Sequence, residues 1–182
     1  MAKSNMHISR LKSIAADVQR TYNWEVIVQQ PAGLSGDFWE DDTITLRARS
    51  AMIPGSTTNA IESTFMGMKQ FFAGNSELEH TLNIEFEEFE DQKLGKLLNA
   101  WQRIIFDAQT DSGSGDTVSE KAAYCSPQFK LRMLKQDGEP MDEAIIFENA
   151  WLQNFASVQV SYGDSSSVKY SCSFQWDYYK LV

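Results

Sequence analysis

The sequence closes with a long strand pattern in which apolar and polar side chains alternate. Over residues 169–178, one set of alternate positions is apolar or aromatic: Tyr170, Cys172, Phe174, Trp176 and Tyr178. The positions between them hold Lys169, Ser171, Ser173, Gln175 and Asp177. Because successive side chains of a β-strand point to opposite faces, the pattern predicts one buried face and one polar face of little bulk. With the stretch VQVSYGDSSS before it, the segment 158–179 predicts two strands joined by a turn.

The same alternation recurs along the chain and indicates an antiparallel fold. Short turns connect most of the alternating segments, whereas parallel strands need long crossover connections. Further strands are predicted at 22–28, 43–49, 81–87, about 127–135 and 144–153. Apolar residues at helical spacing predict an N-terminal helix over 6–20 and an amphipathic helix over 91–107, with Asp91 near its N-terminal cap.

These elements predict an α+β fold. It is a mainly antiparallel β-sandwich or barrel of about seven strands, with an N-terminal helix and one flanking amphipathic helix. Neither an internal repeat nor a second core is indicated, so residues 1–182 are expected to form a single domain.

Residues 54–76 form a long excursion that is unusually apolar for a loop. It carries Ile61, Phe65, Met66, Met68, Phe71 and Phe72. Such a segment either packs as a lid on its own core or marks a contact surface with another chain. We favour the contact surface.

Charge and composition exclude several classes of function. The formal net charge is −9, and an acidic chain repels the phosphate backbone, because tight nucleic-acid binding needs Lys and Arg to displace counterions. No apolar run approaches the roughly 20 residues that span a bilayer. The first twenty residues carry four charges or more and do not read as a secretory signal. We therefore expect a cytoplasmic product without a membrane role.

The sequence offers no convincing catalytic or metal-binding constellation. The acidic run 85–91 fits a solvated strand face leading into a helix N-terminus better than a metal site, whose oxygen ligands converge from several segments. The two histidines and two cysteines lack ligand spacing, and Cys172 reads as a buried, reduced thiol. The stretches GLSGDF and DSGSGD lack the strand and helix context of a nucleophile or phosphate loop. We expect no cofactor and no enzymatic activity.

Taken in order, the segments resemble a tail tube protein of contractile-tailed bacteriophages, a family shared with phage-like bacteriocin and type VI secretion tubes. An N-terminal helix leads into YNWEVIV, a strand ends at MIPG, and the excursion closes at FFAG before an acidic strand. The helix with LLNAWQRIIFD follows, and then the closing stretch FENAWLQNFASVQVSYGDSSSVKYSCSFQWDYY. The resemblance covers nearly the whole chain and depends on the order of these pieces.

The resemblance implies a structural virion protein. Its copies would form hexameric rings that stack into a tube inside a contractile sheath, with sheets of neighbouring subunits joining into one β-barrel around a lumen. The partners implied are the tail sheath protein, the baseplate and tail terminator proteins, and the tape measure protein and genomic DNA that pass through the lumen without specific binding. The protein would reside in the virion tail after assembly in the host cytoplasm.

On this interpretation each predicted surface has a role. The lumen is expected to be lined by small polar side chains and some carboxylates: Glu85, Glu87, Ser157, Gln159, Ser171, Ser173 and Gln175. The apolar residues of 54–76 would contact a neighbouring subunit or ring. The polar side of the outer helix 91–107 would face the sheath through Lys93, Lys96 and Arg103.

Several alternatives remain open. Within the same machine, the chain could be a baseplate tube initiator or a tail terminator, or a tube subunit of a phage-derived contractile injection system. A small ligand-binding β-barrel is the alternative from another class, and it would need an apolar cavity. An enzyme is the third.

Overall fold

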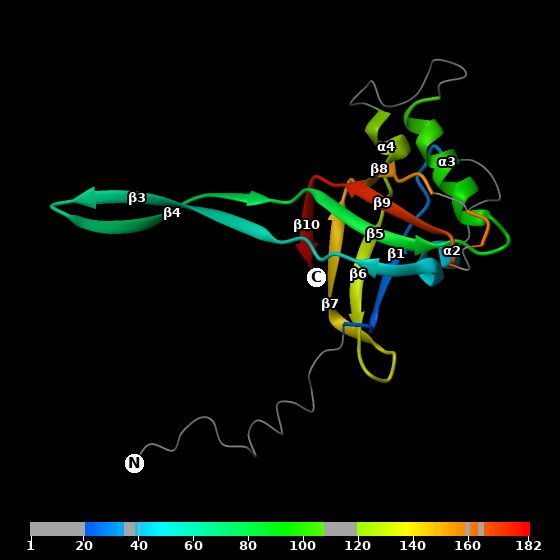
Figure 1. Cartoon of the computed structure of the whole chain (residues 1–182), viewed down its shortest axis with the longest axis horizontal. Helices are drawn as coiled ribbons and strands as arrows, with labels where there is room; N and C mark the ends of the chain where they lie inside the picture. The colour runs from blue at the N-terminus through cyan, green and yellow to red at the C-terminus, as the bar shows by residue number, and fades with distance from the viewer. Residues whose placement is uncertain (1–20, 35–38, 40, 108–119, 159–160, 164–165) are drawn as a thin grey trace, which may run out of the picture.

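The computed structural model describes residues 21–34, 39, 41–107, 120–158, 161–163 and 166–182 (Figure 1). Two four-stranded sheets form the body of the molecule, and every strand pairing among the described residues is antiparallel. This confirms the predicted fold class. The N-terminal helix predicted over 6–20 lies outside the described residues.

Sheet A has the strand order β1-β6-β7-β10. Its strands are β1 (Trp24–Val28), β6 (Phe129–Leu134), β7 (Pro140–Glu148) and β10 (Tyr178–Leu181). Sheet B has the order β2-β5-β9-β8. Its strands are β2 (Ala48–Ala51), β5 (Thr81–Glu87), β9 (Lys169–Gln175) and β8 (Trp151–Phe155). In Figure 1 the strands of sheet A run roughly vertically and those of sheet B roughly horizontally, so the two sheets cross.

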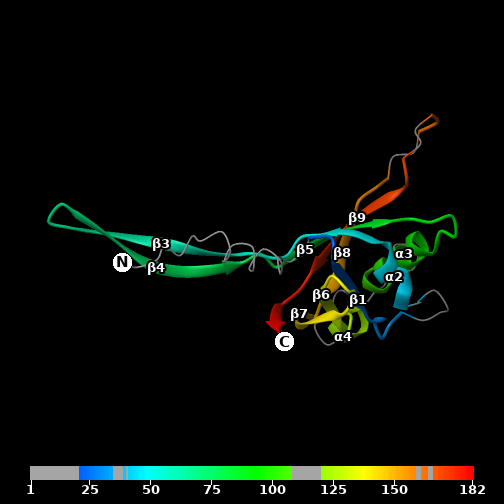
Figure 2. The same ribbon diagram turned by 90° about the horizontal axis from the view of Figure 1, so that it is seen from below.

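A long two-stranded ribbon leaves this body. It consists of β3 (Ser56–Phe65) and β4 (Met68–Leu78), and we call it the hairpin. The hairpin continues the direction of β2 and β5, and α2 (Asp41–Arg47) and α3 (Lys93–Ile105) lie at the opposite end of the body (Figures 1 and 2). The short helix α4 (Lys121–Tyr124) lies near α3.

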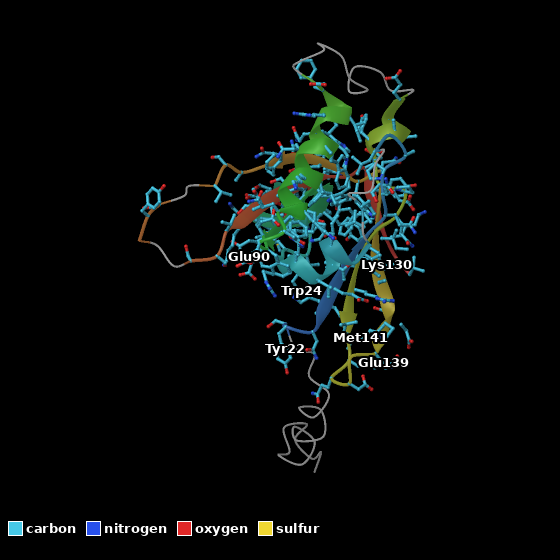
Figure 3. The ribbon with its side chains drawn as sticks, turned by 90° about the vertical axis from the view of Figure 1, so that its right-hand side faces the viewer. Tyr22, Trp24, Glu90, Lys130, Glu139 and Met141 are labelled. Atoms are coloured by element: carbon cyan, nitrogen blue, oxygen red, sulfur yellow. The ribbon has the colours of Figure 1, made fainter. Side chains whose placement is uncertain are left out.

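The core lies between the two sheets and is closed at one end by α3 (Figure 3). The helix buries Leu94, Leu97, Leu98 and Trp101, as its apolar spacing predicts. The Trp101 indole also donates a hydrogen bond of 2.8 Å to the Tyr124 carbonyl, which satisfies its buried N–H. Each such side chain contributes about 1.5–3 kcal/mol on burial, so packing rather than local propensity holds the helix.

The sequence prediction was wrong at 43–49. Ile44 is buried there, but Leu46 is exposed, because residues 41–47 form α2 and β2 begins only at Ala48. Alternation over so few residues cannot distinguish a strand from a two-turn helix. The excursion 54–76 is also a regular hairpin rather than a loop, which helps to bring the number of strands to ten among the described residues.

Two further boundaries differ from the prediction. The strand predicted at 144–153 divides at Asn149, whose φ of 57° ends β7 before β8 begins in the other sheet. Of the two strands predicted over 158–179, the second corresponds to β9, which pairs with both β8 and β5, and the described residues of 158–168 contain no strand. The closing strand is interrupted after Gln175, and β10 joins sheet A. No described helix is long and apolar enough to cross a membrane.

Candidate assembly surfaces

The hairpin exposes all six apolar residues singled out in the sequence. Their exposed fractions are 57% for Ile61, 70% for Phe65, 87% for Met66, 70% for Met68, 66% for Phe71 and 53% for Phe72. Met66 and Gly67 both have positive φ, as a tight two-residue hairpin turn requires. The lid packed on its own core, which the sequence left open, is therefore excluded.

The pairing register divides these residues between two faces of the ribbon. Ile61 lies opposite Phe72 and Phe65 lies opposite Met68, and both pairs fall on one face because their positions differ by an even number. We call this the apolar face of the hairpin. Phe71 lies on the other face, opposite Glu62, which forms a 2.7 Å ion pair with Lys69.

The outward face of sheet B is polar and thinly covered. On β5 and β9, Leu82, Ile84, Phe86, Cys172 and Phe174 point into the core. Their neighbours form cross-strand pairs on the opposite face: Thr81 with Gln175, Asn83 with Ser173, Glu85 with Ser171 and Glu87 with Lys169. We call this set the polar face of sheet B. It brings together five of the predicted lumen residues: Glu85, Glu87, Ser171, Ser173 and Gln175.

The two carboxylates of the polar face have basic partners that the sequence reasoning did not include. Arg49 contacts Glu87 at 2.5 Å, and Lys169 lies 3.5 Å from Glu85. A hydrogen bond from Ser167 and then one from Arg49 lower the pKa of the Glu87 carboxyl. The face therefore carries paired charges, and its acidic residues are matched by Lys169 of the same strand pair and Arg49 of β2.

The remaining predicted lumen residues are placed differently. Ser157 is exposed in the loop after β8 and does not belong to a strand. Gln159 lies outside the described residues. Residues 157, 158 and 161 are not in strands, and the placement of Ser157 and Gln159 at a lumen stays a prediction.

Each sheet ends in strands that pair on one side only within the described chain. In sheet B these edge strands are β2 and β8, and in sheet A they are β1 and β10. Along β8, the side-chain amide of Gln102 in α3 donates to the carbonyls of Leu152 and Gln153 at 3.4 and 3.2 Å. Unpaired edges are templates for pairing with another chain, so they count among the assembly surfaces.

A buried ion cluster fixes the start of α3. Arg47 at the end of α2 is 4% exposed and contacts Glu88 and Asp91, each at 2.6 Å. Glu88 also accepts hydrogen bonds from the backbone N–H groups of Phe89, Leu94 and Gly95. It thus serves as the helix cap, because Gln92 occupies the N-cap without a side-chain bond. The sequence predicted Asp91 near the cap, and Asp91 does accept a hydrogen bond of 3.3 Å from the backbone N–H of Lys93. The hydrogen bond from Arg47 is the main cause that lowers the pKa of Asp91.

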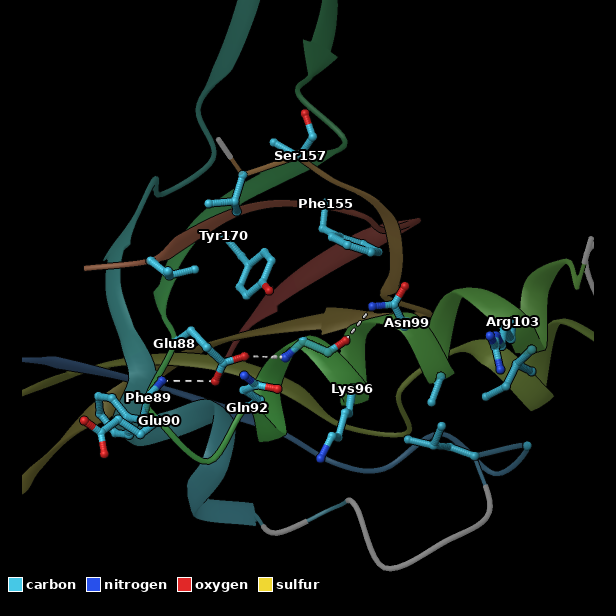
Figure 4. Close-up of a pocket in the computed structure, with 18 residues that line it drawn as sticks. Glu88, Phe89, Glu90, Gln92, Lys96, Asn99, Arg103, Phe155, Ser157 and Tyr170 are labelled. Atoms are coloured by element: carbon cyan, nitrogen blue, oxygen red, sulfur yellow. Dashed lines mark hydrogen bonds between the residues drawn. The ribbon is translucent and has the colours of Figure 1, made fainter. Parts of the chain in front are cut away.

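A groove of about 1220 Å³ runs along the outer side of α3 (Figure 4). The lining includes Gly95, Lys96, Asn99 and Arg103 of the helix and Phe155, Ser157 and Tyr170 of the neighbouring segments. Two of the predicted sheath-facing residues, Lys96 and Arg103, are exposed at this groove, whereas Lys93 is half-buried. A Cβ on Gly95 would lie 2.9 Å from the Tyr170 hydroxyl, so glycine permits the close approach of helix and strand.

Open sheet edges, a polar sheet face and a projecting apolar hairpin define a building block of a larger assembly. The sequence matches the phage tail tube protein family over residues 17–182, and the chain belongs to that family. It is therefore a tube-type structural protein. No curated protein is similar enough in sequence to be matched to the chain.

Solved structures of contractile injection systems share the fold at low sequence identity. A chain of the anti-feeding prophage baseplate is 8% identical with a TM-score of 0.59, over 91% of this chain and 95% of that one. A chain of the anti-feeding prophage tube-terminating cap is 13% identical with a TM-score of 0.57, over 100% and 99%. A chain of the PVC sheath–tube complex in the extended state is 12% identical with a TM-score of 0.59, over 94% and 96%. At these identities the likeness shows the fold alone.

Proposed function

We propose that the chain is the repeated subunit of the inner tube of a contractile phage tail, in which hexameric rings stack around a lumen. The observation that carries this proposal is sheet B. It has a core face, a polar face free of bulk, and an unpaired strand at each edge. Membership of the tail tube family supports the same interpretation.

Ring closure follows from the strand order. In β2-β5-β9-β8 each neighbour is antiparallel to the next, so the two edge strands β2 and β8 run in opposite directions. Pairing β8 of one copy with β2 of the next continues the antiparallel alternation through every subunit. A closed ring of this kind leaves no free edge in sheet B and forms a wide barrel.

In this ring the polar face of sheet B lines the lumen. DNA crossing a long tube meets every ring in turn, so even a weak attraction per subunit would accumulate and stall it. Lys169 of the face contacts Glu85, and Arg49 of the adjacent strand β2 contacts Glu87. They therefore offer no unpaired cations for the phosphates to bind. Genomic DNA and the tape measure protein pass without specific binding.

The hairpin and α3 supply the remaining contacts. The apolar face of the hairpin docks on the adjacent ring, a head-to-tail contact that repeats along the tube axis. Lys93, Lys96 and Arg103 of α3 face the tail sheath protein. Baseplate and terminator proteins bind the two ends of the tube, which is assembled in the host cytoplasm and retained in the virion tail. The chain acts without cofactor or catalysis.

Two related roles share the same fold. Chains of a baseplate and of a tube cap resemble this one as closely as a chain of a sheath–tube complex does. A baseplate initiator or tail terminator therefore stands as the alternative, and so does the tube of an injection system that carries effectors. The hairpin favours the role of a repeated subunit. If it docks on a different surface of the adjacent ring, each added ring offers a new hairpin to the next, so stacking can continue without limit.

Electron microscopy of the purified protein tests the proposal. Concentrated protein, alone and seeded with short tube fragments, is expected to form hollow rods built from hexameric rings. Single rings that never stack would indicate a terminator or initiator. A chain that stays monomeric under both conditions would refute the proposed function.

A further inference from the structure

The groove along α3 has the features of a docking site for another protein segment. Its far wall is formed by the aromatic rings of Phe155 and Tyr170, whose centroids are 6.2 Å apart, and its near wall by α3 (Figure 4). At about 1220 Å³ the groove is larger than any one side chain could fill. It lies where β8 ends and its unpaired edge continues into the loop.

A matching apolar side chain projects from the other edge of the same sheet. The short helix α2 precedes β2 and buries Thr43, Ile44 and Arg47, which are 5%, 2% and 4% exposed. Leu46 points away from this packing and is 67% exposed. An exposed leucine alone needs no explanation, but this one stands immediately before an unpaired edge strand.

The strand registers show which ends of the two edges correspond. Ala48 at the start of β2 lies opposite Phe86 of β5, which lies opposite Tyr170 of β9. Phe155 at the end of β8 lies opposite Cys172, two residues further along β9. The start of β2 and the end of β8 therefore lie at the same end of sheet B. When β2 of one copy extends the sheet beside β8 of another, α2 is brought to the end of the sheet where Phe155 and Ser157 line the groove.

We infer that Leu46 of one copy inserts into the groove between α3 and Phe155 of the next copy in the ring. The occupant is a second copy of this chain, and the inference rests on the proposed ring. The groove accepts the turn of α2 that carries Leu46 together with the side chain itself. This contact fixes the register of the β8–β2 pairing, which backbone hydrogen bonds alone specify weakly.

Cysteine cross-linking tests the contact directly. The double variants Leu46→Cys/Asn99→Cys and Leu46→Cys/Ser157→Cys place one thiol on α2 and one on either wall of the groove. The native thiols do not compete, because burial raises the pKa of Cys125 to about 11 and that of Cys172 to about 12. After assembly and oxidation, a ladder of covalent oligomers up to the hexamer is expected from at least one double variant.

The control pair is Leu181→Cys/Asn99→Cys. Leu181 is as exposed as Leu46, at 67%, but it lies on β10 of sheet A. This pair and the single variants are expected to give no ladder. Rings and rods that form without a ladder from either Leu46 pair would overturn the contact while leaving the tube function standing. Failure of the wild-type chain to form rings would overturn both.

Assembly measurements provide a second readout. Leu46→Ser is expected to leave the unfolding midpoint of the monomer unchanged and to raise the concentration needed for assembly about five- to thirty-fold. Leu46→Met keeps the apolar volume and should assemble within about threefold of wild type. Equal assembly by the serine and methionine variants would contradict the insertion of Leu46.

Discussion

The apolar face of the hairpin predicts which of two neighbouring phenylalanines matters more for tube formation. Ranking them by exposure alone would predict the opposite order. Phe71 is the more exposed of two neighbouring phenylalanines, at 66% against 53% for Phe72. Phe72 lies on the face with Ile61, Phe65 and Met68, whereas Phe71 lies beside the Glu62–Lys69 ion pair. If the apolar face docks on the adjacent ring, Phe72→Ser should impair tube formation more than Phe71→Ser.

The magnitude follows from the area that docking can still remove from water. Complete burial of a phenylalanine contributes about 1.5–3 kcal/mol, so the exposed half of Phe72 is worth about 0.8–1.6 kcal/mol per subunit. At about 1.4 kcal/mol per tenfold, the serine variant needs roughly four- to fourteen-fold more protein to assemble. Phe71→Ser should require less than about threefold more. The double variant is expected to remain soluble and to form no tubes at concentrations where wild type does, since the losses add.

Sedimentation measures this directly. The concentration of unassembled protein at equilibrium is determined after pelleting the tubes, and thermal unfolding of the dilute monomer serves as the control for folding. Both single variants should unfold with wild type, because neither side chain is packed against the body. An unimpaired Phe72→Ser, or a greater effect at Phe71, would refute the assignment of the docking face.

Three further predictions concern the body of the subunit. Glu88→Ala should lower the free energy of unfolding, measured by urea titration, by about 2–4 kcal/mol, because it removes one carboxylate from the buried Arg47 and the cap of α3. The control Glu90→Ala, at an exposed residue, should stay within about 0.5 kcal/mol of wild type. Hydrogen bonds from Lys121 and then from Asn149 hold the pKa of Asp177 below its ordinary value of 3.8. The contribution of Asp177 to the stability of the fold is therefore complete above about pH 3.8 and is lost as the pH falls through the lowered pKa. The difference in Tm between wild type and Asp177→Asn should therefore shrink in acid, and a constant difference would contradict the linkage. Glu85→Lys/Glu87→Lys tubes should retain a short DNA duplex at low salt that wild-type tubes release; equal release would place the polar face away from the lumen.

Local periodicity predicted the elements whose burial is repetitive. The alternation over 81–87 and 169–175 and the helical spacing over 93–105 correspond to β5, β9 and α3, because each presents one continuous face to the core. The same logic failed for α2, where the helix is set by the contacts of Arg47 with Glu88 and Asp91 across more than forty residues. A local pattern contains no information about such partners.

The assembly surfaces were predictable only in part for a similar reason. The apolar content of the hairpin was evident from composition, but its division into two faces depends on the register between β3 and β4. The groove is formed by α3 together with residues 155–158 and Tyr170, which follow the helix by roughly fifty residues or more in the chain. The strand predicted over 43–49 places Leu46 on its buried face. In the structure this residue belongs to the helix α2 and is exposed.

If the chain forms the proposed tube, the distribution of charge has two consequences, one before assembly and one in the lumen. The whole chain carries a formal charge of −9, which opposes premature association between copies whose hairpins and sheet edges are exposed. On the polar face of sheet B, however, Glu85 and Glu87 are paired with Lys169 and Arg49. A strongly anionic lumen would repel DNA at every ring, and a cationic one would bind it. In the proposed tube, paired charges and small side chains on the lumen face reduce both the repulsion and the binding of DNA. The passage of DNA then depends little on the number of rings crossed, and the excess of acidic residues lies on other surfaces of the subunit.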